Sequence, residues 1–211
     1  MDQSLFRETI TSKQELNELC GYPSEPVKHK VVFRLDPSIR DFISKSPMLF
    51  MATSDAAGNC DVSPRGDEAG FVLTLDDFHL VIPERPGNKR FDSLGNIVEN
   101  PRIGLIFIIP GLKETLRING QACIIRDQDL MERLKAKNKV PLFGIGVKVE
   151  ECYMHCAKSF IRSQVWEPSS WLSPEALPNP SAILAEHTKK LGRTEEDVRQ
   201  SLQDSYENRL Y

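Results

Sequence analysis

The chain has 211 residues, of which 40% are apolar and 27% charged, so it is long enough for one well-buried core and short for two. Its formal net charge of −3 excludes a global attraction to nucleic acid or to an anionic membrane. The longest apolar run, "IGLIFIIPG", is too short to span a bilayer, and the opening "MDQSLFRETITSKQEL" lacks the apolar region of a signal peptide. With five scattered cysteines, expected to be reduced thiols, the chain is predicted to be cytoplasmic.

The first 46 residues predict two helices and one short strand. Ser12 and Glu15 have the spacing of a capping box, which predicts a helix beginning near residue 12. Residues 30–35, "KVVFRL", favour a short strand. Asp36 and Pro37 combine an N-cap residue with proline at the first helical position, so a second helix is expected over residues 37–46.

From Pro47 to residue 154 the pattern is that of strands joined by short turns. About six strands are expected, drawn from the apolar segments at residues 48–54, 60–66, 70–76, 78–84, 102–109, 115–125 and 144–154. Residues 102–109 lack alternation, which predicts a strand buried on both faces. Helices are expected after residue 91 and after Asp127. Short connections favour antiparallel neighbours, and such a sheet commonly closes to hide its edges, so we predict a mainly β (α+β) antiparallel barrel with peripheral helices.

The tail has a different composition. Residues 166–180 are rich in proline and serine, and two helical segments follow, the second with Thr194 as its expected N-cap. We therefore predict one barrel domain over residues 1–166, including the N-terminal helices. Residues 167–211 are expected to form a helical extension packed on the same domain.

The stretch "ERPGNKRFDSLGNIVENP", residues 84–101, is the first candidate site. Asn88, Lys89 and Arg90 stand directly before a predicted helix, where positive charge opposes the helix dipole. Free amide groups at a helix start together with two cations suit an anion, and arginine offers phosphate a planar pair of donors. The alternative is a solvated basic turn. The chain has neither a Walker glycine pattern nor a Rossmann fingerprint.

Two further stretches carry polar residues where structure alone does not require them. In "SPRGDEAGF", Ser63 and Arg65 interrupt an expected strand, and the neighbouring proline favours a bulge that aims side chains into a site; a surface hairpin is the alternative. In "HCAKSFIRSQVW", Lys158 and Arg162 share a helical face. Ser163 and Trp166 follow, so one segment brings together charge and a large aromatic side chain. The alternative is that Trp166 fills the core.

No metal site is expected. Cys152, His155 and Cys156 lie close together in the sequence, but their spacing matches no standard zinc pattern and no second pair of ligands follows.

Several of these segments, in this order, resemble the pyridoxamine 5′-phosphate oxidase-like FMN-binding split-barrel proteins. The matching segments are "LFMATSDAAGNCDVSPRGDEAGFV", "LVIPERPGNKRFDSLGNIVENPRIGLIFIIPG", "ETLRINGQA" and "HCAKSFIRSQVW", and the resemblance covers about residues 10–166. It is closest to an uncharacterised bacterial branch with the SPRGD and RPGNKR motifs. The resemblance implies a six-stranded split barrel and a homodimer that holds two FMN molecules at the subunit interface.

The resemblance also implies a set of cofactor-binding residues. Arg65 corresponds to a strand arginine that reaches the phosphate side of FMN, and Asn88, Lys89 and Arg90 correspond to the segment that grips the phosphate. Thr115 falls where the oxidases have a glutamine near the flavin ring. The expected set is completed by Ser63 and by Lys158, Arg162, Ser163 and Trp166, of which the last three belong to a segment that would reach the flavin from the partner subunit.

One departure separates this chain from the true oxidases, which carry a C-terminal Arg-x-His pair for the vitamin substrate; this sequence has none. The resemblance therefore implies FMN binding rather than vitamin B6 oxidation. We expect a flavin-dependent oxidoreductase acting on an unknown small molecule, with its catalytic residues unassigned. The alternatives are a split-barrel protein that uses deazaflavin or haem, a non-catalytic flavin-binding or regulatory protein, and a structural dimer with an empty cleft.

Overall fold

The computed structural model describes residues 5–211. Residues 1–4, where the expected barrel domain and the sequence opening begin, lie outside the described residues. The helices are α1 (Lys13–Cys20), α2 (Glu25–His29), α3 (Pro37–Lys45), α4 (Asp92–Glu99), α5 (Gln128–Arg133), α6 (Lys158–Ser163), α7 (Pro180–His187) and α8 (Glu195–Asn208). Short 3-10 turns lie at Pro168–Ser170, Pro174–Ala176 and Lys189–Leu191. Within this described range, no helix is long and apolar enough to cross a membrane.

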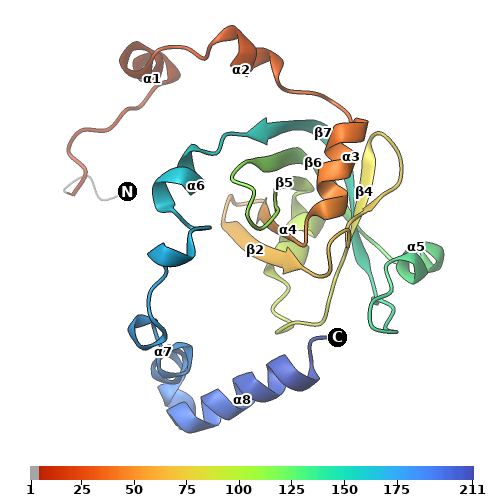
Figure 1. Ribbon diagram of the computed structural model, residues 1–211, viewed down its shortest axis with the longest axis vertical. Helices are drawn as coiled ribbons and strands as arrows, with labels where there is room; N and C mark the ends of the chain where they lie inside the picture. Colours follow the sequence, from red (N-terminus) through yellow and green to blue (C-terminus); the bar gives the residue numbers. More distant parts are fainter. Residues whose placement is uncertain (1–4) are drawn as a thin grey trace.

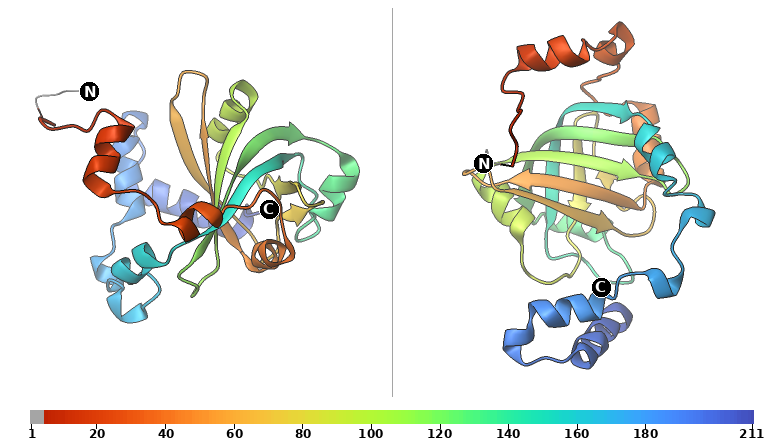
Figure 2. Two further views of the ribbon diagram at one scale, coloured as in Figure 1. Left: turned by 90° about the horizontal axis from the view of Figure 1, so that it is seen from above. Right: turned by 90° about the vertical axis from the view of Figure 1, so that its left-hand side faces the viewer.

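One antiparallel sheet forms the body of the molecule (Figure 1). Its strands are β1 (Met48–Ser54), β2 (Cys60–Gly66), β3 (Leu73–Thr74), β4 (His79–Pro83), β5 (Arg102–Ile108), β6 (Thr115–Ile125) and β7 (Gly144–His155). Their order across the sheet is β2-β1-β5-β6-β7-β4-β3. Figure 2 shows the sheet strongly curled, as in a barrel. The prediction of an antiparallel split barrel with peripheral helices is confirmed, with seven strands in place of six because the short β3 adds one pairing with β4.

The concave side of the sheet encloses the core. Alternate residues of the strands, among them Leu49, Leu105, Phe107, Leu116 and Ile145, are 0–1% exposed. Helix α3 closes this core with Ile39, Phe42 and Ile43 and begins as predicted, because the side chain of Asp36 accepts a hydrogen bond from the Ile39 amide at 2.9 Å. The predicted N-cap Thr194 is likewise confirmed, in a full capping box with Asp197.

Two local predictions were wrong. Residues 30–35 do not form a strand: only Val32 pairs, in a single bridge to Cys152, and Phe33 is 68% exposed. Strand β5 is not buried on both faces, because its residues alternate and Ile106 is 38% exposed. The uncovered face of β5 lies on the convex side of the sheet, which the described part of this chain leaves open.

The N-terminal and C-terminal segments extend away from the sheet (Figures 1 and 2). Helices α7 and α8 pack against each other, and the chain returns from α8 to end at Tyr211, next to the loop between β4 and α4. The division of the chain into a barrel at residues 1–166 and an extension at residues 167–211 stays a prediction.

Candidate functional site

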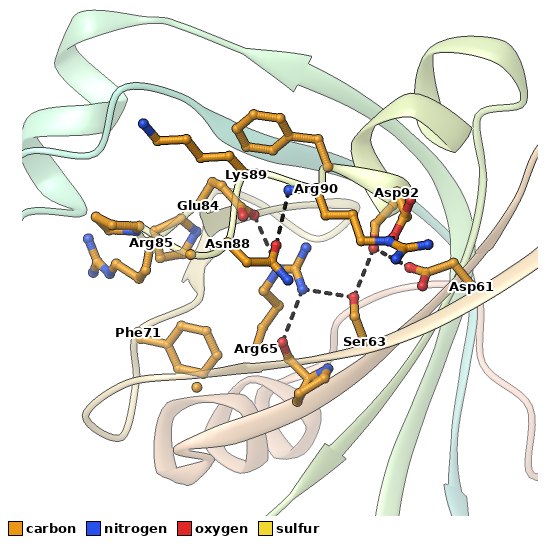
Figure 3. Close-up of a pocket in the computed structure, with 17 residues that line it drawn as sticks. Asp61, Ser63, Arg65, Phe71, Glu84, Arg85, Asn88, Lys89, Arg90 and Asp92 are labelled. Atoms are coloured by element: carbon orange, nitrogen blue, oxygen red, sulfur yellow. Dashed lines mark hydrogen bonds and ion pairs between the residues drawn. The ribbon is translucent and has the colours of Figure 1, made fainter. Parts of the chain in front are cut away.

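A cavity of about 370 Å³ lies between β2 and the loop of residues 84–91 that joins β4 to α4 (Figure 3). Five of the residues that line it were singled out in the sequence. Ser63 and Arg65 come from β2, and Asn88, Lys89 and Arg90 come from the loop. The structure therefore brings together two polar segments that are about 25 residues apart in the chain.

Strand β2 directs its polar side chains into this cavity. Asp61, Ser63 and Arg65 are two residues apart, so they share one face of the strand. The guanidinium group of Arg65 donates from Nη1 to Ser63 Oγ at 2.8 Å and to the carbonyl of Pro64 at 3.0 Å, and from Nε to Glu84 Oε2 at 3.1 Å. These bonds fix the guanidinium plane at the cavity wall.

A chain of hydroxyl groups connects β2 to the first turn of α4. Ser63 Oγ and Ser93 Oγ are 2.8 Å apart, and Ser93 Oγ donates to a carboxylate oxygen of Asp61. Ser93 is 3% exposed. Because Arg65 bonds Ser63 at one end of this hydrogen-bonded series and Asp61 accepts from Ser93 at the other, the start of α4 has a fixed position relative to Arg65. The role of Ser93 and Asp61 was missed by sequence reasoning, since neither residue stands in an unusual local pattern.

The loop before α4 has an unusual backbone. Lys89 and Phe91 have positive φ angles of 61° and 58°, which few residues other than glycine adopt. The side chain of Asn88 stabilises the turn by accepting a hydrogen bond from the Arg90 amide at 3.0 Å. Phe91 is the N-cap residue of α4 and its side chain supplies no cap, so the helix begins without a side-chain acceptor for its first amide groups.

The positive charge before α4 is partly compensated within the chain, by a contact that was not predicted from the sequence. Arg90 forms an ion pair with Asp92 in the first turn of the helix, and its side chain is 76% exposed. In Figure 3, Arg90 runs toward Asp92, whereas Lys89 runs away from Ser63 and Arg65. Lys89 makes no ion pair within the described part of the chain.

The cavity lining carries four cations and three carboxylates. Arg65, Arg85, Lys89 and Arg90 face Asp61, Glu84 and Asp92, which leaves one net positive charge. Exposed pairs such as Arg90–Asp92 contribute little to stability, so a doubly charged anion can compete with the carboxylate for the guanidinium group.

Glu84 is held in a largely buried position, with its side chain 15% exposed. Burial raises the pKa of Glu84 above its ordinary value, and the nearby positive charge of Arg65 and its hydrogen bond oppose this rise without cancelling it. An anion bound beside Arg65 would add repulsion and raise the pKa of Glu84 further.

A second charged group lies behind the loop, and its pairing was not predicted from the sequence. Arg85 Nε donates to Asp67 Oδ2 at 2.6 Å, and the Asp67 side chain is 3% exposed. The Tyr211 hydroxyl donates to Asp67 Oδ1 at 2.5 Å, and the Tyr211 ring lies 5.9 Å from the Arg85 guanidinium. Burial raises the pKa of Asp67, but hydrogen bonds from Tyr211, the Glu68 amide and Arg85 outweigh it and bring the pKa below its ordinary value.

The remaining predicted residues lie elsewhere. Thr115 is 3% exposed and pairs with His155 at the start of β6. The Trp166 indole donates to the Leu112 carbonyl at 2.9 Å and packs against Phe160 with ring centroids 5.8 Å apart. Neither residue lines the cavity, and the same holds for Lys158, Arg162 and Ser163 of the α6 segment.

No metal centre is found in the described range, where no three His, Cys, Asp or Glu side chains gather around one point. Cys152 is fully buried, and burial raises its pKa to about 11. Its thiol donates to the Arg34 carbonyl at 3.2 Å. This cysteine is therefore a core residue.

Comparison with known families decides the relationship of the chain. Residues 35–156, more than half of the chain, match the family described as pyridoxamine 5′-phosphate oxidase. The chain belongs to the pyridoxamine 5′-phosphate oxidase family. The matched segment contains the whole sheet and both walls of the cavity, whereas α1, α2 and everything after Cys156 lie outside it. No curated protein sequence matches the chain.

Several solved structures have related folds, and two of those that follow carry different ligands in their names. HupZ from Group A Streptococcus is 21% identical, with a TM-score of 0.46 over 56% of this chain and 90% of its own. An FMN-binding protein from Syntrophomonas wolfei is 12% identical, with a TM-score of 0.41 over 58% and 91%. The haem storage protein HutZ from Vibrio cholerae is 17% identical, with a TM-score of 0.37 over 56% and 89%. Membership of the pyridoxamine 5′-phosphate oxidase family rests on the sequence match, and the cofactor must be argued from the site.

Proposed function

We propose that the chain is an FMN-binding flavoprotein whose cavity between β2 and the 84–91 loop holds the phosphate end of the cofactor. The observation that carries this proposal is the donor set. Arg65 presents a fixed guanidinium group, Arg90 and Asn88 lie opposite it in the loop, and α4 begins beside them without a side-chain cap. A phosphomonoester is a dianion with several acceptor oxygens, which this set suits.

The lining chemistry favours a phosphate over a haem iron. The residues described around the cavity include no His, Cys, Met or Tyr, the side chains that ligate haem iron in proteins. A deazaflavin cofactor also bears phosphate and would use the same donors, so mass spectrometry of the released ligand separates it from FMN.

When bound, FMN supplies the electron-transfer chemistry, and the protein's part is to bind it, orient it and limit access. We propose that Arg65, Arg90 and Asn88 anchor the phosphate and that the loop backbone fixes their spacing. The reaction proposed is a hydride transfer between the flavin and an unidentified small organic molecule or a nicotinamide donor. We also propose a cytoplasmic location, with which the free state of all five cysteines agrees.

The proposed active form is a homodimer. The convex face of the sheet exposes Val62 by 64% and Ile106 by 38%, beside Phe50. A second copy packed on this face would cover the side of β5 that a single chain leaves open. It would also bring a second α6 segment, with Arg162, Ser163 and Trp166, to complete a site that those residues do not reach within one chain.

The dimer is tested by Val62→Asp, with Val98→Asp as a control on α4, where the side chain is 75% exposed. We expect the parent and the control to sediment as dimers and Val62→Asp to shift to the monomer with loss of bound FMN. A parent protein that sediments as a monomer with FMN bound would contradict this arrangement.

The cofactor is tested by absorbance of the purified protein and by reconstitution with FMN. Replacing both Lys89 and Arg90 with Ala is expected to abolish FMN retention without unfolding the barrel. The matched control is Lys189→Ala with Lys190→Ala, two exposed lysines of the tail. A colourless parent that gains no FMN refutes FMN binding, and unchanged retention in the Lys89 and Arg90 variant refutes the phosphate assignment. Reduction of the bound flavin by NADH or NADPH, or by a panel of small substrates, then distinguishes an enzyme from a non-catalytic flavin carrier.

A further inference from the structure

A second cavity, of about 230 Å³, lies against the 84–91 loop, and only its loop residues are shared with the first cavity. It shares Glu84, Arg85, Pro86, Gly87, Lys89 and Phe91 with the first cavity, and its other residues are Lys139, Val140, Pro141, Leu142, Phe143 and Tyr211. Arg90, Asn88 and Arg65 do not line it. The loop is therefore a partition, with the proposed phosphate site on one side and this second cavity on the other.

The far wall of the second cavity is apolar although it is open to solvent. Leu142 is 84% exposed, Phe91 49% and Val140 37%. The Phe91 and Phe143 rings meet edge to face with centroids 6.3 Å apart, which joins the loop to this wall. Apolar side chains left uncovered around a concavity are typical of a ligand site.

The charged groups of this cavity are mostly cationic. Lys89, whose side chain Figure 3 shows running away from Ser63 and Arg65, forms no ion pair among the described residues. Lys139 donates from Nζ to the Tyr211 main-chain oxygen. The single side-chain carboxylate in the lining, Glu84, is already bound to Arg65. A ligand with one negative group would therefore meet the Lys89 ammonium, whose charge no side-chain carboxylate of the described residues neutralises.

The side of the cavity that the 84–91 loop forms has a strained backbone. Lys89 and Phe91, which both line the cavity, have positive φ angles that residues other than glycine rarely adopt. Such conformations often occur where a ligand is held. Tyr211, fixed by its hydrogen bond to Asp67, lines another side.

We propose that this second cavity binds a small carboxylic acid with an apolar body, such as a single ring with a short acid chain. Its carboxylate lies on Lys89, and its hydrocarbon part lies on Val140, Leu142 and Phe91. The volume is below the range of about 300–1,000 Å³ for drug-sized ligands, which limits the ligand to this size. The site is separate from the proposed phosphate site and shares only the loop with it.

The test uses the full chain and three probes measured by ligand-observed NMR and calorimetry. They are 3-phenylpropionate, its neutral amide, and acetate. We expect saturable binding of 3-phenylpropionate, and at least tenfold weaker binding of the amide and of acetate, because each lacks one half of the recognised chemistry. Equal binding of the acid and its amide, or no binding of the acid, would overturn the proposal.

Variants locate the site. Leu142→Asp should lower the affinity for 3-phenylpropionate at least tenfold. The control Leu191→Asp, at a leucine of the tail that is 74% exposed, should leave this affinity unchanged. Lys89→Met should weaken binding of the acid and leave binding of the amide unaffected, with Lys190→Met as its control. Unchanged affinity for the acid in Leu142→Asp overturns the assignment. If the parent binds no acid and Leu142→Asp changes the oligomeric mass, the proposal is also overturned, because the surface is then an interface between copies.

Failure of this inference and failure of FMN binding give different results. Arg90→Ala removes a residue of the first cavity only and should lower FMN retention while 3-phenylpropionate still binds. Leu142→Asp should do the reverse. Acid binding in a protein that takes up no FMN would support the second cavity and refute the first assignment, and FMN binding without acid binding would do the opposite.

Discussion

Arg65 Nε lies 3.1 Å from Glu84 Oε2, and the two side chains are only 17% and 15% exposed. This ion pair joins β2 to the end of β4, which are not neighbours in the sheet. It therefore bridges the open side of the barrel at the mouth of the cavity. A pair in this position both holds the walls together and orients the guanidinium group toward the cavity.

Removing one member of this pair should be costly. Arg65→Ala leaves Glu84 buried without its partner, and we expect a loss of about 3 kcal/mol in the free energy of unfolding, measured by urea denaturation. Arg65→Lys keeps the charge and should lose clearly less free energy of unfolding. It should still weaken the proposed binding of FMN, because a lysine cannot reproduce the planar donors. Equal stability of the parent and Arg65→Ala would show that the pair does not hold the barrel together.

The pH dependence of stability should report Glu84. Because burial raises the pKa of Glu84 in the folded chain above 4.5, the folded state binds the proton more tightly than the unfolded state. Its contribution to stability is therefore present below pH 4.5 and is lost as the pH rises through the folded pKa. Glu84→Gln should lack this loss, so the difference between the two unfolding curves should grow from pH 4.5 upward. A constant difference from pH 4.5 to 8 would contradict the shift.

The hydroxyl group of Tyr211 should contribute measurably to the free energy of unfolding, because it donates a hydrogen bond to Asp67, whose side chain is 3% exposed. Tyr211→Phe keeps the ring beside Arg85 and removes only this bond, so we expect a loss of about 1.5 kcal/mol. The pKa of Asp67 is lowered in the folded chain, so its contribution is present above pH 3.8 and is lost as the pH falls through the folded pKa. Tyr211→Phe should make this acid loss smaller, and Tyr206→Phe, at an exposed tyrosine, should change neither quantity.

Two glycines should respond in opposite ways to replacement by alanine. A Cβ at Gly120, where β6 is irregular beside β7, would lie 2.1 Å from the Lys148 carbonyl oxygen, so Gly120→Ala should displace the strand and cost several kcal/mol, on the order of overpacked cores. A Cβ at Gly95 in α4 meets nothing within 4 Å. Gly95→Ala should therefore raise stability by about 1 kcal/mol. Thermal unfolding of both variants beside the parent measures the contrast.

The sequence was informative where local chemistry decides the structure. Asp36 and Thr194 were predicted as N-caps because capping depends on a few neighbouring residues. The segments that supply Arg65 and Arg90 were singled out separately, because polar residues interrupt an expected strand and two cations precede a helix, and the family resemblance assigned both to one phosphate. Residues 30–35 were predicted wrongly because their strand propensity is overridden by a lack of partners beyond Val32.

The part of the site that the sequence did not predict depends on contacts between distant residues. Tyr211 and Asp67 are 144 residues apart, and nothing in the pattern around either residue indicates the other. The pairing of Arg90 with Asp92 was overlooked for a different reason, since the two are close in sequence but their contact depends on the positive φ of the loop. Sequence periodicity indicates which residues share a face of a helix or strand. It does not indicate which distant part of the fold the C-terminal tail contacts.

Strand β2 serves both sides of the sheet at once. Its odd-numbered residues, Asp61 to Arg65, face the cavity, while Val62 and its even-numbered neighbours face outward. A shift of the β2 register by one residue would exchange the two sets. Arg65 would then point to solvent and Val62 into the cavity, so the alternation of this one strand places the guanidinium group inside and the apolar surface outside.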